Sequence, residues 1–164
     1  ADVGVLAQLV KDDRYLSVPF SRHPIGIFTS TAHRFARRRS IRLAELQGER
    51  MILREHGSTT RKALEVAMQK AGVEAEVVME ISSREVIREA VSQGIGIAAV
   101  STVEFVPGPG LHMVNISDSD IYTYAHVVCL AERRTMRMVK AFFDTVSLPA
   151  EGSPRTARRK SLVR

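Results

Sequence analysis

Between residues 51 and 100 the sequence alternates short apolar runs with longer amphipathic ones, and this order restricts the fold more than any other feature. MILR (51–54), EVVMEI (76–81) and IGIAAV (95–100) have the length and composition of β-strands. The stretches between them have the spacing of amphipathic helices. Strand, helix, strand, helix, strand at these intervals is typical of parallel βαβ units. We therefore predict an α/β fold.

The two intervening helices carry their own start and stop signals. The first begins after Gly57 and ends at Gly72, where a left-handed C-cap is expected. The second has Ser82 and Glu85 in the spacing of a capping box and ends at Gly94. Each has an apolar face: Leu64, Ala67, Met68 and Ala71 in the first, and Val86, Ile87, Ala90 and Val91 in the second.

Other segments extend this pattern on both sides. Residues 1–6 are expected to form a buried strand, and YLSVPF and PIGIFTS to form two extended segments separated by residues 21–23. A basic connector, HRFARRRSIR, leads into a short helix around residues 43–46. The remaining predicted elements are a turn at PGPG (107–110), strands at LHMVNI (111–116) and TYAHVVCL (123–130), and a helix over about 134–146 with Val139, Phe142, Phe143 and Val146 on one face.

The composition is that of a globular protein, since 45% of the 164 residues are hydrophobic. The formal net charge of +6 is unevenly placed. The last fourteen residues hold five basic side chains against Glu151 alone, which amounts to +4. A basic end of this kind is either a solvated, disordered tail or a contact for a polyanion. We predict a basic, disordered tail over residues 149–164.

The single cysteine, Cys129, has no partner for an internal disulfide, which favours a reducing, cytoplasmic environment. No apolar run reaches the ~20 residues of a membrane helix, and the N-terminus lacks the features of a secretory signal. ADVGV has no methionine and begins like a strand already under way. The sequence therefore predicts a cytoplasmic chain, truncated at its N-terminus and without a membrane partner.

Catalytic and metal sites find little support. His126 and Cys129 are near in sequence, but alternation along a strand places them on opposite faces, so they form no dyad. The five histidines lack metal-ligand spacing. Gly94 and Gly96 follow a helix and precede a strand, which is the reverse of the nucleotide-binding order. We predict no catalytic residue, no metal and no cofactor.

The segment HGSTTR, at the start of the first helix, is the main candidate site. A helix N-terminus leaves backbone N–H groups without partners and is partly positive. Gly57 allows close approach, and Ser58, Thr59 and Thr60 add hydroxyl donors, so together they can hold a carboxylate, sulfate or phosphonate. The alternative is that Ser58 only caps the helix.

Three motifs in this order are similar to those of one family. Leu46–Gln47–Gly48 ends a short helix, Gly57–Arg61 opens the next one, and Gly94–Ala98 leads into a strand. Together with the flanking segments they resemble the effector-binding domain of LysR-type transcriptional regulators over about residues 1–146. His33–Arg34 departs from the His-Pro that many members have there. The resemblance implies a fold like the periplasmic binding proteins, with two α/β lobes and an effector in the cleft between them.

The resemblance also implies a division of the chain and a set of ligand contacts. Residues 1–20 would belong to the first lobe with a crossing segment, 21–115 to a complete second lobe, and 116–148 to the return strand and last helix of a partial first lobe. The implied effector contacts are Gly57, Ser58, Thr59, Thr60 and Arg61, with Ala7, Gln8, Ser101 and Thr102 as further candidates. Arg61 has a structural alternative, because an arginine at a helix start often pairs with a carboxylate of its own lobe.

The implied function is to sense a small anionic effector and to modulate DNA binding by a helix-turn-helix domain that this sequence lacks. Homo-oligomerisation is implied as well. SVPFSRH, REHGSTTR and SSREVIREAVSQGIGIAAVS further resemble regulators associated with aminoethylphosphonate catabolism, which implies a phosphonate effector. The alternatives are a solute-binding protein of a transporter with the same fold, and an enzyme on a similar scaffold.

Overall fold

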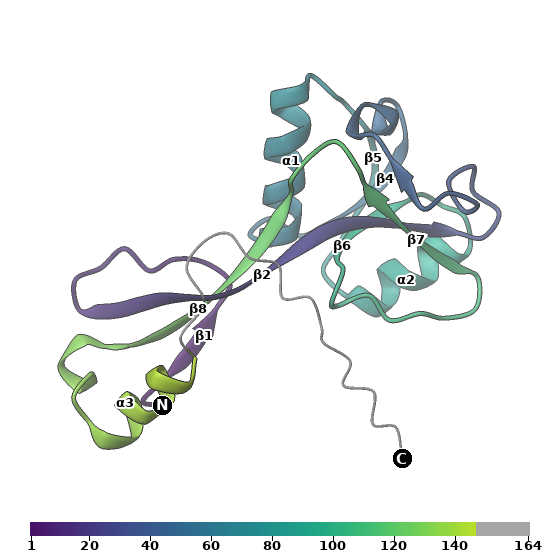
Figure 1. Cartoon of the computed structure of the whole chain (residues 1–164). Coiled ribbons are helices and arrows are strands. Elements are labelled where there is room, and N and C mark those ends of the chain that lie inside the picture. The colour runs from purple at the N-terminus through teal and green to yellow at the C-terminus, as the bar shows by residue number, and fades with distance from the viewer. Residues whose placement is uncertain (147–164) are drawn as a thin grey trace, which may run out of the picture.

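Two long strands run through the molecule and connect its two ends (Figure 1). The computed structural model describes residues 1–146, and the predicted tail lies outside them. Strand β2 (Tyr15–Ser30) pairs antiparallel with β8 (Tyr122–Leu130) from Tyr15 to Pro24. The prediction of two separate segments over this stretch was wrong. A register shift between Pro19 and Ser21 absorbs the irregular residues as a bulge, so the strand continues through them.

The first strand differs from its prediction in burial. Strand β1 (Gly4–Leu6) forms as expected and pairs antiparallel with β8, but Val5 is 57% exposed and Leu6 is 42% exposed. Strand β1 is the edge of its sheet, and no other strand of the described chain pairs with it. The apolar composition of residues 1–6 shows only that these side chains could be buried. Whether they are buried depends on which other elements pack against them. The prediction of a buried strand was therefore wrong.

The other end of the molecule is an α/β body in which β2 is buried on both faces. Ile25 and Ile27 join the core cluster that includes Leu64 of helix α1 (Thr59–Ala71), and Phe28 joins a second cluster with Ile87 of helix α2 (Arg84–Ser92). The two helices therefore cover opposite faces of the sheet. The remaining elements are β3 (Ser40–Ile41), η1 (Leu43–Leu46), β4 (Arg50–Arg54), β5 (Glu76–Ile81), β6 (Ala98–Ser101), β7 (Leu111–Ile116), η2 (Ala131–Arg133) and α3 (Arg137–Thr145).

The predicted parallel units are present in part. Strands β4 and β5 pair in parallel, as the spacing predicted. The third strand is shorter than expected, and β6 pairs antiparallel with β2. One parallel bridge, Met51 with Ile97, still aligns β4 with the segment that leads into β6. The C-terminal ends of β4 and β6 consequently lie at one edge of the body, where helix α1 begins.

The helix boundaries test the capping predictions. Gly72 ends α1 in the left-handed region, with φ of 65°, as predicted. Helix α2 is capped by Ser83, whose Oγ accepts from the Val86 N–H, so the prediction of Ser82 as the cap was one residue early. The exposed side chain of Val86 is likewise outside the buried face of α2. Helix α3 starts at Arg137, later than expected, because η2 precedes it.

Candidate functional site

The N-terminal tip of α1 combines a cap with unpartnered amides. Ser58 Oγ accepts from the Arg61 N–H at 3.4 Å, and the Ser58 carbonyl accepts from the Lys62 N–H at 3.0 Å. Within residues 1–146 the backbone N–H groups of Thr59 and Thr60 have no hydrogen-bond partner. Gly57, with φ of 98°, turns the chain into the helix. The cap therefore uses Ser58 and leaves two donors at the positive end of the helix.

Arg61 is bound within its own half of the molecule. Its Nε donates to Glu65 at 2.7 Å, its Nη1 donates to the Arg54 carbonyl at 2.7 Å, and it forms an ion pair with Glu80 at 2.7 Å. These carboxylates, Glu65 first, raise the pKa of Arg61, and Arg61 in turn lowers the pKa of Glu80. This is the structural arrangement that the sequence left open, and these contacts hold the tip in place; a contact between Arg61 and a ligand stays a prediction.

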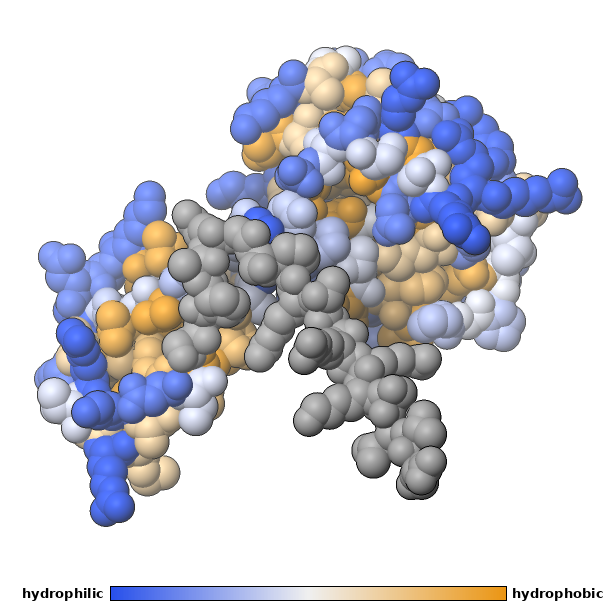
Figure 2. All heavy atoms as spheres, viewed as in Figure 1, coloured by the Kyte–Doolittle hydropathy of each residue, from blue (hydrophilic) through white to orange (hydrophobic). Residues whose placement is uncertain are grey.

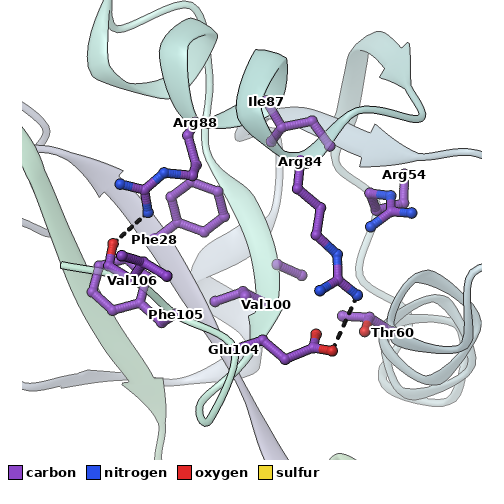
Figure 3. Close-up of a pocket in the computed structure, with 11 residues that line it drawn as sticks. Phe28, Arg54, Thr60, Arg84, Ile87, Arg88, Val100, Glu104, Phe105 and Val106 are labelled. Atoms are coloured by element: carbon purple, nitrogen blue, oxygen red, sulfur yellow. Dashed lines mark hydrogen bonds and ion pairs between the residues drawn. The ribbon is translucent and has the colours of Figure 1, made fainter. Parts of the chain in front are cut away.

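A small pocket of about 50 Å³ adjoins the tip (Figure 3). Thr60 enters it from α1, Arg54 from the end of β4, and Arg84 from the start of α2, where Figure 3 shows its side chain reaching toward Glu104 and Thr60. The lining residues are Phe28, Arg54, Thr60, Arg84, Ile87, Arg88, Ala99, Val100, Glu104, Phe105 and Val106. The pocket thus has an apolar, partly aromatic wall and a cationic wall.

The charges around the pocket leave an excess of positive charge. Arg84 pairs with Glu104 at 3.1 Å, and Arg54 pairs with Glu55 at 2.7 Å, which holds the pKa of Glu55 at about 2. Arg88 donates to the Val106 carbonyl, which is neutral. The lining itself holds three guanidinium groups against one carboxylate, Glu104, whereas Glu55 and Glu85 lie near Arg54 and Arg84 outside the lining. The charge of the lining favours an anionic ligand.

The second predicted segment, Ser101 and Thr102, lies at the edge of the body where β4 and β6 end. Ser101 ends β6, is 2% exposed, and its Oγ is one of the few buried side-chain atoms without a hydrogen-bond partner in the described chain. Thr102 follows it, and its backbone N–H donates to the Pro24 carbonyl at 2.9 Å. Because the C-terminal ends of β4 and β6 share an edge, residues 57–61 and 101–102 converge there, in the position where ligands bind in open α/β sheets.

Ala7 and Gln8 do not join this group. They follow β1 beside the middle of the β2–β8 pair, because Leu6 pairs with His126 and His126 pairs with Pro19. Both are exposed, and neither lines the pocket. Conversely, Arg54, Arg84 and Arg88 line it but were not singled out from the sequence. Arginine is common on protein surfaces, and no local motif distinguishes these three. They come together only because α2 packs against β4.

Other reactive groups offer no site. Cys129 is 3% exposed, and burial raises the pKa of its thiol, which disfavours the reactive thiolate. Residues 1–146 contain no group of three or more His, Cys, Asp or Glu side chains placed to hold a metal ion. In the same residues, no helix is long and apolar enough to cross a membrane.

The α/β body, the long connecting strands and the donor-rich edge define the class of two-lobed effector-binding domains. The regulatory domain of CcmR from Synechocystis, solved in complex with 2-PG, matches with a TM-score of 0.74 at 25% identity, over 88% of this chain and 71% of that one. The effector-binding domain of QuiR, in complex with shikimate, shares the fold with a TM-score of 0.76 at 14% identity, over 88% and 69%.

The chain belongs to the LysR substrate binding domain family, whose family model matches residues 1–147. The HTH-type transcriptional activator CmpR from Synechocystis sp. is 29% identical over 129 residues. This match covers 76% of this chain and 42% of CmpR, so the chain spans about two fifths of that relative's length. The predicted mixed α/β fold, of the periplasmic-binding-protein-like type, is confirmed. The relatives are named as transcriptional regulators and not as enzymes.

Proposed function

We propose that this chain is the ligand-sensing part of a LysR-type transcriptional regulator and binds a small anionic effector at the tip of α1. The observation that carries the proposal is the pair of unpartnered amides at Thr59 and Thr60. A helix N-terminus that presents free N–H groups at the carboxyl edge of an α/β sheet attracts anions. The nearby excess of guanidinium charge supports the same ligand class.

The lobe assignment belongs to this proposal. Residues 1–20 and 116–146 form part of the first lobe with the crossing strands, and residues 21–115 form the second lobe; residues 147–148 of the predicted range lie outside the described residues. The β2–β8 pair, which joins both ends of the molecule, supports this division (Figure 1). Effector binding stabilises one arrangement of the two lobes relative to each other. The change in this arrangement alters how the whole protein binds DNA. The names of the relatives as HTH-type regulators support DNA as a partner of the whole protein. Homo-oligomers as the working form and the cytoplasm as the compartment are parts of the proposal that rest on the resemblance described from the sequence.

The effector is a small compound with a phosphonate, phosphate or carboxylate group. Such a group has several acceptor oxygens, which match the two free amides and the hydroxyls of Thr59 and Thr60. CcmR was solved with 2-PG and QuiR with shikimate, and these ligands give the first compounds to test. The resemblance to phosphonate-associated regulators adds 2-aminoethylphosphonate. The small pocket lined by Phe28 and Phe105 adjoins the tip through Thr60.

Calorimetric titration of the chain with 2-PG and 2-aminoethylphosphonate tests the proposal. Thr59→Ala/Thr60→Ala keeps the Ser58 cap and should weaken binding at least tenfold, and adding Ser58→Ala should abolish it. The control Thr31→Ala/Thr135→Ala removes two exposed hydroxyls elsewhere and should leave the affinity unchanged. An affinity that is the same in all three variants and the wild type would rule out the α1 tip as the effector site.

A further inference from the structure

The loop after β2 carries four arginines and Arg42 follows β3, which makes five arginines in nine positions, 34–42. The effector site uses none of them. The loop lies at the C-terminal end of β2. Because β2 runs antiparallel to β6, this end lies beside the start of β6, at the edge opposite to Ser101 and the α1 tip. Whatever binds this loop therefore binds away from the proposed effector.

The loop is held rigidly in place. Phe35, fully buried, anchors it in the core cluster, and the guanidinium of Arg34 stacks on its ring at 4.5 Å from the centroid. The Arg38 carbonyl is hydrogen-bonded to His112 Nε2 at 3.0 Å, and the Arg39 carbonyl accepts from the Asn115 N–H at 3.1 Å. A backbone fixed at its centre and its end presents its side chains in a constant arrangement, which reduces the entropy lost on binding.

Local carboxylates neutralise two of the five arginines and leave three. Arg34 forms an ion pair with Glu49 at 2.6 Å, and Arg38 pairs through both nitrogens with Glu45. The guanidinium groups of the other three have no carboxylate within ion-pair distance in residues 1–146 and are all exposed. We call these three the arginine ridge: Arg37, Arg39 and Arg42. Figure 2 shows hydrophilic residues on the side of the α/β body toward which β2 runs in Figure 1.

The chemistry of the arginine ridge favours one kind of partner. Guanidinium groups bind phosphate oxygens in bidentate geometry. Phe35 is buried, and the ring of His33 packs against it and is bound to Glu49, so the ridge offers no platform for stacking the bases of a single strand. It also lacks an exposed apolar anchor of the kind that dominates protein–protein interfaces. We propose that the arginine ridge binds the phosphate backbone of duplex DNA, as a sequence-independent contact additional to any DNA-binding domain.

Fluorescence anisotropy with a labelled duplex of about 30 base pairs and arbitrary sequence tests this proposal on the whole 164-residue chain. Because the tail is also basic, the parent protein carries serine at Arg155, Arg158, Arg159, Lys160 and Arg164. In this parent, Arg37→Gln/Arg39→Gln/Arg42→Gln should weaken binding at least tenfold at 50 mM salt. The slope of log K against log salt should fall by about 2.7, from about 0.9 for each lost phosphate contact.

Two controls keep the test specific. Lys11→Gln/Arg134→Gln/Arg137→Gln removes three exposed charges at the other end of the molecule and should change the affinity less than threefold. Glu45→Gln releases Arg38 and should tighten DNA binding, more than Glu132→Gln does. Equal losses from both triple variants, no binding by the tail-substituted parent, or binding only to an acidic protein would each overturn the proposal.

Discussion

At the scale of single residues, the hydroxyls that begin α1 and α2 separate capping from ligand binding. Ser58 and Ser83 each accept from the amide three residues later, which is the ordinary cap. The sequence offered Ser58 as the cap of α1 as an alternative to ligand binding. It placed the cap of α2 one residue early, because Ser82 and Ser83 are adjacent and Glu85 follows both. Which of two adjacent serines caps the helix depends on the backbone dihedral angles, and the spacing of residues in the sequence does not reveal these angles.

The α2 cap gives the first prediction. Ser83→Ala should lower the free energy of unfolding by about 1 kcal/mol, because it leaves the Val86 N–H without its acceptor. Ser82→Ala should change it by less than about 0.5 kcal/mol, as expected for a substitution outside the cap. Urea unfolding followed by circular dichroism measures both. A larger loss from Ser82→Ala would contradict the assignment of the cap.

The ion pair of Arg38 and Glu45 predicts a pH dependence. The hydrogen bond from Arg38 lowers the pKa of Glu45 from 4.5 to about 2. A lowered pKa in the folded state means that the unfolded state binds the proton first, so the contribution is present above pH 4.5 and is lost as the pH falls toward 2. Arg38→Met should bring the pKa of Glu45, measured by NMR titration, back toward 4.5. A pKa that stays near 2 in this variant would show that Arg38 is not its cause.

At the scale of elements, the predictions from the sequence were correct for elements whose structure is determined by their own residues. Helix α1, strands β5 and β7 and the left-handed Gly72 have local signals and formed as expected. The continuous β2 was missed because Pro19 and Pro24 look like breaks, although a bulge allows a strand to pass through them. The antiparallel pairing of β6 was missed because it depends on β2, which is distant in sequence.

The approach of β6 to β4 gives the next prediction. A Cβ on Gly96 would lie 2.6 Å from the Arg50 carbonyl oxygen, which accepts from the Ile97 N–H in the parallel bridge. Gly96→Ala should therefore cost about 2 kcal/mol, in the range of overpacked cores. Gly4→Ala, where a Cβ would meet nothing within 4 Å, is the matched control and should be close to neutral. Equal effects of the two substitutions on thermal unfolding would contradict this close approach.

At the scale of the whole molecule, the candidate site depends on contacts that no motif describes. The tip of α1 could be predicted, because a glycine followed by hydroxyls before a helix is a local pattern. The cationic wall of the pocket could not, since Arg54, Arg84 and Arg88 come from two elements and meet only after β4 and α2 pack. Ser101 was suggested by the family resemblance, and its buried, unpartnered hydroxyl became visible only in the structure.

The most direct test compares two substitutions of Thr59, the first helical residue after the Ser58 cap. Proline is well tolerated at this position, and the ψ of 123° at Ser58 suits a residue before proline. Thr59→Ala removes only the hydroxyl, whereas Thr59→Pro also removes the amide N–H. In calorimetric titrations with inorganic phosphate, 2-PG and 2-aminoethylphosphonate, Thr59→Pro should bind the preferred anion at least tenfold more weakly than Thr59→Ala, with similar thermal stability. Equal affinity of the two variants for every anion would contradict the account.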